Sequence, residues 1–222
     1  MTSTLFITGT DTGVGKTVLT MLLAEFLRSR SLRVAALKPI CSGGREDARR
    51  LHSALGGALP LDQINPWHFR AAIAPLLAAR KERKRVTLAR VLAHLRKVRP
   101  PFEVVLVEGA GGLLSPLGAG FNSRDLIAAL AATPIVVAPN QLGVVNHILL
   151  TLEALPEALR HQARVVLVSP PKPDSAMASN ARLLRQLSVK NICPLPWFGP
   201  GFLASEVWQS PPVRKTLAKL VD

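Results

Sequence analysis

Tyrosine is absent from the 222 residues, and aromatic side chains make up only 5% of them. Proteins that bind single-stranded nucleic acid commonly stack bases on aromatic rings, and this chain has few rings to offer. Long apolar runs are missing as well, since none reaches the roughly 20 residues of a membrane-spanning helix. The first strand-like run starts at residue 5, which leaves no room for a signal peptide, so we expect a cytoplasmic protein without a membrane partner.

Cysteine is scarce: the chain has only Cys41 and Cys193, and their separation matches no metal-ligand spacing. We therefore expect two reduced, structural thiols. The five histidines are spread along the chain, a distribution that does not favour a zinc site.

Acidic residues are also few, because 14 Asp and Glu face 28 Lys and Arg, which gives a net charge of +14 and a pI of 11.2. The densest basic block spans residues 80–85. Such a balance is compatible with nucleic acid, with an anionic surface, or with a solvated basic face and small anionic ligands. Because aromatic residues are so few, we favour the solvated face and regard a nucleic-acid partner as the weaker interpretation.

Apolar residues, by contrast, make up 48% of the chain, and the mean hydropathy is +0.26. This composition and length fit a single folded domain over residues 1–222. Short apolar runs alternate with helical patterns, which predicts an α/β fold with a doubly wound, mostly parallel sheet. The expected strands are 5–8, 33–37, 104–107, 135–138 and 165–168; the expected helices are 16–30, 46–55, 87–98, 123–132, 144–159, 175–187 and 212–221. Residues 53–80 show no clear pattern, Pro156 is expected to end or kink its helix, and 170–173 resembles a rigid proline-rich loop.

Residues 9–17 read Gly-Thr-Asp-Thr-Gly-Val-Gly-Lys-Thr, directly after an apolar run and directly before a helical one. A strand, a glycine-rich turn and a helix start in this order gather backbone N–H groups around one point, as phosphate-binding loops do. Lys16 can then reach the β and γ phosphates, and the Thr17 hydroxyl can bind Mg²⁺. The loop is one residue longer than the usual Gly-x-x-x-x-Gly-Lys-Ser/Thr. This segment predicts a P-loop NTPase fold that binds a nucleoside triphosphate.

Polar residues follow the second and third expected strands, at the edge of the sheet where doubly wound proteins bind their ligands. Lys38 could enter the crevice of Lys16 and stabilise a transferred phosphoryl group, or it could reach solvent. Asp47 could approach the metal, or it could serve as a charge in the first turn of its helix. Glu108 ends a buried strand, where a P-loop protein is expected to hold Mg²⁺, and the glycine-rich residues 109–112 leave room for a ligand.

Together these segments resemble the dethiobiotin synthetase family, the ATP-dependent ring-closing enzymes of biotin synthesis. The matching segments, in family order, are 9–17, 38–43, Asp47, 65–69, 74–79, 107–112, 142–147 and 195–198. The resemblance implies a reaction in which CO₂ joins 7,8-diaminopelargonic acid as a carbamate, ATP phosphorylates the carbamate, and the second amine closes the ureido ring. It also implies Mg²⁺ as cofactor, and a homodimer whose substrate site lies near the subunit interface.

The same resemblance assigns roles to individual residues. The catalytic residues would be Lys16, Lys38 and Thr12. The nucleotide and its metal would be bound by Gly13, Val14, Gly15, Lys16, Thr17, Val18, Asp47, Glu108, Gly109, Ala110, Gly111, Pro196, Trp197 and Phe198. The substrate would meet Thr12, Lys38, Ser42, Asn146 and Asn180. Mg²⁺ would be held by Thr17, Asp47 and Glu108. By itself, Asn146 is equally compatible with a polar position in the first turn of a helix.

Two departures from the family pattern concern specificity. The family commonly has Asn-Asp after the fifth strand to read adenine, whereas this chain has Ser169-Pro170-Pro171, which leaves the base preference open to other nucleoside triphosphates. Because the chain has no tyrosine, Asn180 is the candidate to meet the substrate carboxylate from the neighbouring subunit.

A partition or positioning ATPase of the ParA/MinD type is the alternative hypothesis, since binding to DNA or membrane would suit the basic charge. Such proteins usually carry an extra lysine early in the P-loop, where this chain has Thr10, Asp11 and Thr12. We therefore favour the ligase.

Overall fold

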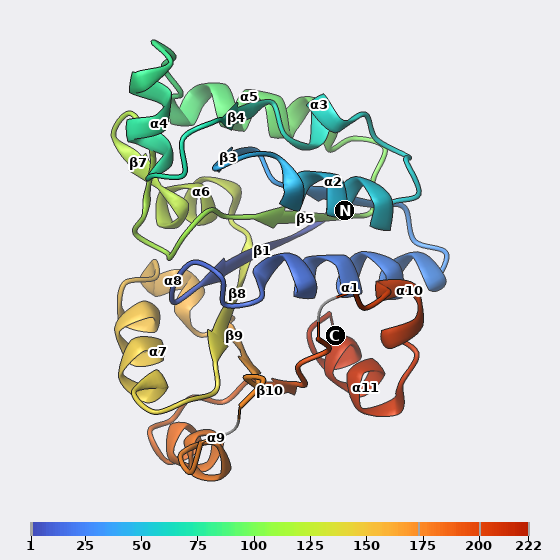
Figure 1. Cartoon of the computed structure of the whole chain (residues 1–222), viewed down its shortest axis with the longest axis vertical. Coiled ribbons are helices and arrows are strands. Elements are labelled where there is room, and N and C mark those ends of the chain that lie inside the picture. The colour runs from blue at the N-terminus through green and yellow to red at the C-terminus, as the bar shows by residue number, and fades with distance from the viewer. Residues whose placement is uncertain (1, 173, 200, 222) are drawn as a thin grey trace.

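A parallel sheet of six strands lies at the centre of the molecule (Figure 1). Across the sheet, the strands are β10 (Ile192–Leu195), β9 (Arg164–Val168), β8 (Thr133–Pro139), β1 (Ser3–Gly9), β5 (Val104–Glu108) and β2 (Val34–Leu37). All neighbouring pairs are parallel, which confirms the predicted doubly wound α/β fold. This computed structural model describes residues 2–172, 174–199 and 201–221; Pro173 of the expected proline-rich loop and the end residues of the predicted domain lie outside them.

Helices flank the sheet (Figure 1). The longer ones are α1 (Lys16–Ser29), α2 (Glu46–Ala54), α5 (Leu88–Val98), α6 (Ser123–Leu130), α7 (Val144–Glu153), α9 (Met177–Gln186) and α11 (Pro211–Lys219). The shorter ones are α3 (Leu61–Ile64), α4 (Pro75–Lys81), α8 (Glu157–Arg160) and α10 (Ala204–Val207). None of the helices in the described ranges combines the length and the apolar character that crossing a bilayer would require.

The structure corrects the predicted elements in three places. The helix expected over 144–159 is two helices, α7 and α8, and Pro156 lies at the N-cap of the second, where its fixed φ suits a helix start. Strand β10 was not predicted, because Pro194 interrupts its apolar pattern. The unassigned residues 53–80 hold the end of α2, then α3, β4 (Trp67–Phe69) and most of α4, with β4 pairing in parallel with β3 (Ile40–Ser42). A further small pair joins β6 (Pro116–Gly118) and β7 (Phe121–Asn122).

The P-loop is anchored at both of its ends by the hydrophobic core. Phe6 and Ile7 in β1 are fully buried, and so are Leu19, Leu22 and Leu23 in α1. Burying each of these side chains contributes roughly 1.5–3 kcal/mol, which fixes the strand before the loop and the helix after it. The loop backbone is therefore held in place from both sides.

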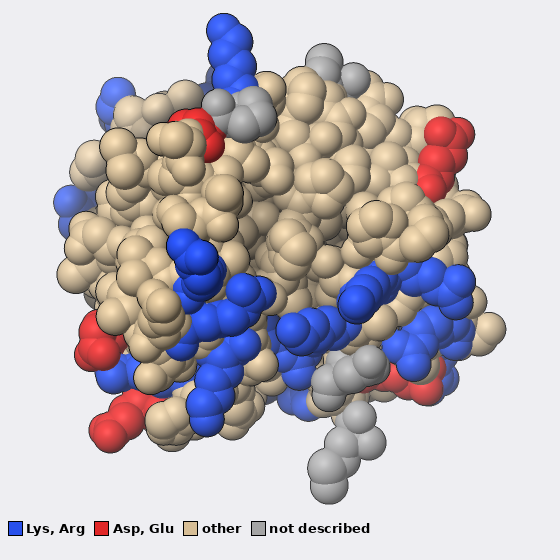
Figure 2. All heavy atoms as spheres, turned by 90° about the horizontal axis from the view of Figure 1, so that it is seen from below, with Lys and Arg blue, Asp and Glu red and all other residues tan. Residues whose placement is uncertain are grey.

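The basic charge is spread unevenly over the surface. Figure 2 looks at the molecule from below Figure 1, where α9, β10 and α11 lie, and shows Lys and Arg side chains gathered over one half of this face. Arg182 and Arg185 in α9 and Arg214 and Lys215 in α11 are all exposed. Water solvates these side chains, so the charge needs no buried counter-ions.

Candidate active site

The loop between β1 and α1 has the backbone conformation of a phosphate-binding loop. Gly15 is the N-cap of α1 with φ of 100°, a left-handed conformation that favours glycine, and no side chain caps the helix. A Cβ on Gly9 would lie 2.7 Å from the Val14 side chain, so the tight turn also depends on glycine there. The uncapped N–H groups at the start of α1 are left for an anion.

Lys16 lies in this loop with its side chain largely buried. Its Nζ donates a hydrogen bond to the Asp11 carbonyl oxygen at 2.6 Å. Burial, and next the nearby Lys38 ammonium, lower the pKa of Lys16 to about 8, whereas the surrounding carboxylates act in the opposite direction. An anionic ligand would restore the charged form, so the position of Lys16 suits phosphate.

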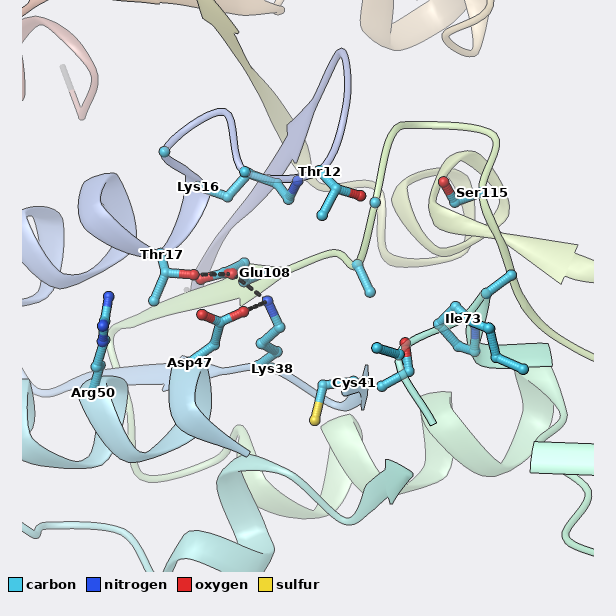
Figure 3. Close-up of a pocket in the computed structure, with 18 of the residues that line it drawn as sticks. Thr12, Lys16, Thr17, Lys38, Cys41, Asp47, Arg50, Ile73, Glu108 and Ser115 are labelled. Carbon is cyan, nitrogen blue, oxygen red and sulfur yellow. Dashed lines mark hydrogen bonds and ion pairs between the residues drawn. The ribbon is translucent and has the colours of Figure 1, made fainter. Parts of the chain in front are cut away.

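Four side chains from different elements form one hydrogen-bonded cluster around Lys38 at the centre of the site (Figure 3). The Lys38 Nζ donates to Asp47 Oδ2 at 2.6 Å and to Glu108 Oε1 at 2.6 Å, and Thr17 Oγ1 donates to the same Glu108 oxygen at 2.7 Å. Lys38 follows β2, Asp47 lies in the first turn of α2, and Glu108 ends β5. Of the two positions considered for Lys38, the structure has the buried one, facing the cavity it shares with Lys16.

Burial and ion pairing act in opposite directions on these groups. Burial alone would lower the pKa of Lys38, but the carboxylates of Glu108 and Asp47 outweigh it and raise this pKa above its usual range. Burial likewise would raise the pKa of Asp47, and the Lys38 ammonium outweighs it and lowers that pKa. Lys38 and Asp47 are therefore both charged at neutral pH.

One oxygen of this cluster has no partner. Glu108 Oε2 is buried and accepts no hydrogen bond, and its side chain is 0% exposed. A buried carboxylate oxygen without a donor is unfavourable, so this atom fits a cation that also meets Thr17 and Asp47. No group of three or more His, Cys, Asp or Glu side chains that could hold a metal occurs in the described ranges, so a divalent ion here would need further oxygens from a ligand.

A cavity of about 680 Å³ opens beside the cluster (Figure 3). Its walls are Thr12, Gly13, Gly15, Lys16, Thr17, Val18, Lys38, Cys41, Ser42, Asp47, Arg50, Ala72, Ile73, Ala74, Pro75, Glu108, Ala110, Gly111 and Ser115. One part of this wall is charged, and the segment 72–75 is apolar. Such a cavity suits a ligand that carries both phosphate-like and aliphatic parts.

Most of the predicted site residues line this cavity, and seven do not. The seven are Val14, Gly109, Asn146, Asn180, Pro196, Trp197 and Phe198. Val14 is buried beneath its loop, and the Gly109 N–H donates to the Ile7 carbonyl at 2.9 Å. Asn146 is exposed on α7. Asn180 is buried in α9, where its Nδ2 donates to Asn140 Oδ1 at 2.9 Å and to the Gln141 carbonyl at 3.2 Å.

The residues 196–198 follow β10, next to the segment that follows β9. The Ser169 N–H donates to the Leu195 carbonyl at 2.8 Å, and the two prolines after it have no N–H. Trp197 is 49% exposed. This part of the molecule thus offers the exposed ring of Trp197, and residues 169–171 have no free backbone N–H to donate.

Sequence reasoning missed several residues of the wall. Arg50 lies one turn after Asp47 in α2, and this i, i+3 spacing could have indicated a shared face. The Ser115 Oγ accepts a hydrogen bond from the Gly112 N–H at 2.9 Å. The Cys41 Sγ contacts the Gly44 carbonyl at 2.9 Å and Asn65 Oδ1 at 3.2 Å. Cys41 lies in the matching segment 38–43 but was expected only as a structural thiol, and no sequence pattern singled out Ser115.

Comparison with known proteins identifies the family. The family model described as "AAA domain" matches residues 3–199. An ATP-dependent dethiobiotin synthetase BioD of Anaeromyxobacter dehalogenans (strain 2CP-C) is 43% identical over 199 residues, which cover 87% of this chain and 89% of that protein. The chain belongs to the dethiobiotin synthetase family. A second member, from Methanococcus vannielii, is 36% identical over 151 residues, covering 68% of this chain and 72% of the relative.

Membership of the dethiobiotin synthetase family confirms the resemblance predicted from the motif segments. The comparisons give less support to the ParA/MinD-type alternative, because its similarity to this chain is one of fold. A ParA family ATPase from Chlorobium tepidum superposes with a TM-score of 0.62 over 98% of this chain and 97% of that chain, at 10% sequence identity. This likeness shows the P-loop fold that the two families share.

Proposed function

We propose that this chain is an ATP-dependent dethiobiotin synthetase that forms the ureido ring from 7,8-diaminopelargonic acid, CO₂ and a nucleoside triphosphate. The observation that carries the proposal is the placement of Lys16 and Lys38 around one cavity, with Lys38 fixed by Glu108 and Asp47. Family membership supports the same conclusion.

The residues act by positioning reactants and neutralising charge. The P-loop N–H groups and Lys16 bind the phosphates, and a carbamate formed on the diamine lies near Lys38. A carbamate oxygen attacks the γ phosphorus, and the nucleoside diphosphate leaves. The second amine then attacks the activated carbonyl carbon and expels phosphate. The substrate supplies both nucleophiles, so the enzyme needs no nucleophilic side chain, and Lys38 stabilises the negative charge that moves between the groups.

Thr17, Asp47 and Glu108 would hold Mg²⁺, and the unpaired Glu108 Oε2 supports this assignment. Bound there with phosphate oxygens, the ion neutralises charge on the triphosphate. The Lys38 ammonium contacts both carboxylates and compensates their charge.

The apolar wall at 72–75 suits the aliphatic chain of the diamine, and Thr12 and Ser42 offer hydroxyls to its polar end. For the rest of the substrate we propose a homodimer. Two exposed leucines lie four positions before and after Asn146, namely Leu142 at 81% and Leu150 at 61% exposure, and a second subunit would cover them. Asn146 and Asn180 would then meet the substrate of the partner subunit, Asn180 after exchanging its present contacts.

The experiment that tests the function is an activity assay with the purified protein. The diamine, bicarbonate, Mg²⁺ and ATP are mixed, and dethiobiotin is measured by mass spectrometry. We expect product that depends on all four components, and omission of Mg²⁺ should abolish it. Absence of product with ATP, CTP, GTP and UTP would disprove the proposal.

A further inference from the structure

Arg50 lines the same cavity, although no motif pointed to it. It lies in α2 one turn after Asp47, so the two side chains share a face of the helix. Figure 3 shows Arg50 on the far side of Asp47 from Lys38, level with Thr17. Arg50 therefore adds a third cation to the site from a direction that neither lysine covers.

The present partner of Arg50 holds it only weakly. Its Nε lies 3.3 Å from Glu46 Oε1, and the two side chains are 52% and 65% exposed. Exposed pairs of this kind contribute little to stability, so the guanidinium can exchange this carboxylate for a phosphate at small cost. Lys38, by contrast, is held by two carboxylates in a buried position.

The charges on the cavity wall also favour this role. Three cations, Lys16, Lys38 and Arg50, face two carboxylates, Asp47 and Glu108. Without Arg50 the wall would be neutral, and with it the wall has one positive charge to offset the negative charge of a metal-bound triphosphate. Arg50 is thus the residue that makes the wall positive.

We propose that Arg50 binds the phosphates that are not transferred, from the side opposite Lys16. The P-loop N–H groups bind the α and β phosphates, and the lysine reaches β and γ. Thr17, at the start of α1, lies at the end of the cavity where Arg50 lies (Figure 3), so the guanidinium would face the α and β positions. The proposal rests on the proposed function only in taking a nucleotide as the ligand.

The test measures equilibrium binding of MgADP and of a magnesium complex of a non-hydrolysable ATP analogue by calorimetry. Arg50→Ala should weaken both ligands roughly 5- to 20-fold, because one charge-assisted contact to a phosphate is lost. Arg50→Lys should weaken them less, since it keeps the charge and loses the two-pronged geometry. The loss of affinity in Arg50→Ala should become smaller as the salt concentration is raised, because Arg50 is half exposed and salt screens its charge.

Arg49→Ala is the matched control. Arg49 lies 3.8 Å from the same Glu46, is 63% exposed and does not line the cavity. This variant should keep both affinities within about twofold. In turnover, Arg50→Ala should raise the KM for ATP and leave kcat nearly unchanged.

Three results would overturn the assignment: unchanged affinities in Arg50→Ala, an equal loss in Arg49→Ala, or a loss limited to the triphosphate analogue. If Arg50→Ala failed to fold by circular dichroism, Arg50→Lys and Arg50→Gln would decide by the same measurements. Nucleotide binding without dethiobiotin formation would remove the proposed function and leave the Arg50 assignment testable by these affinities.

Discussion

At the scale of single residues, Lys38 is the residue whose charge state depends most on its surroundings. The residue is 4% exposed and its ammonium contacts two carboxylates, an arrangement that keeps it charged despite burial. The sequence left open whether this side chain reaches solvent. The contact with Glu108, which is 70 positions away along the chain, decides it.

Lys38→Ala should lower turnover roughly 100-fold or more, because it removes a preorganised cation from the transferred group. Binding of the magnesium complex of an ATP analogue should change much less, since the P-loop and Lys16 remain. Steady-state kinetics and calorimetry measure the two effects.

Lys190→Ala, at an exposed lysine, is the control for a change of net charge. Lys38→Ala should also lower the melting temperature, because it leaves a buried carboxylate without its counter-charge. Equal losses in binding and turnover would contradict the proposed role of Lys38.

Cys41 offers a test that depends on pH. Burial raises the pKa of its thiol, so little thiolate is present at neutral pH. We expect alkylation by iodoacetamide at pH 7 to be at least roughly tenfold slower than in the urea-unfolded chain, and to accelerate as pH rises. Peptide mass spectrometry follows Cys41 separately from Cys193, and labelling as fast as in urea would contradict the buried position.

At the scale of elements, we propose that the segments after β9 and β10 meet the nucleobase. The Ser169 N–H is already bonded to the Leu195 carbonyl, and Pro170 and Pro171 supply no N–H. The ring of Trp197 is half exposed nearby and can stack on any base. We therefore expect weak base recognition by hydrogen bonds from this segment.

We accordingly expect ATP, CTP, GTP and UTP to support dethiobiotin formation with kcat/KM values within roughly tenfold of one another, because stacking discriminates little between bases. Turnover assays with the four nucleotides at equal Mg²⁺ measure this. A preference for ATP of a thousandfold would show that base-reading groups lie elsewhere.

The central elements could be predicted from the sequence because their patterns are local. Continuous apolar runs indicated five of the six central strands, and glycines followed by Lys16 and Thr17 indicated the loop. Strand β10 was not predicted because a proline in the sequence argues against a strand, although an edge strand tolerates one. Arg50 and Ser115 were not predicted as site residues because only tertiary packing brings them to the cavity wall.

At the scale of the whole molecule, the basic half of the face in Figure 2 differs in charge composition from the site. Lys and Arg predominate on that half, whereas the cavity wall contains both cations and carboxylates. Exposed cations on α9 and α11 are solvated and repel one another, which favours solubility. The exposed Leu142 and Leu150 on either side of Asn146 lie outside α9 and α11, and they are the residues proposed to contact a second subunit.

Light scattering after size-exclusion chromatography should give twice the 23.9 kDa of one chain. Leu150→Asp should shift the protein toward monomer and raise the KM for the diamine, because a carboxylate would be buried in the interface. Leu203→Asp, at another exposed leucine, should keep the dimer. A monomeric wild-type protein with full activity would contradict the homodimer.

Pro194 bears on how the protein is expected to behave at high concentration. It lies exposed in the outermost strand, whose free side would otherwise present a row of main-chain donors and acceptors. A residue without an amide hydrogen interrupts such a row, so a strand from another molecule finds fewer partners there. We expect Pro194, together with the hydrogen bond that the Thr216 hydroxyl donates to its carbonyl oxygen at 2.8 Å, to reduce edge-to-edge pairing between molecules.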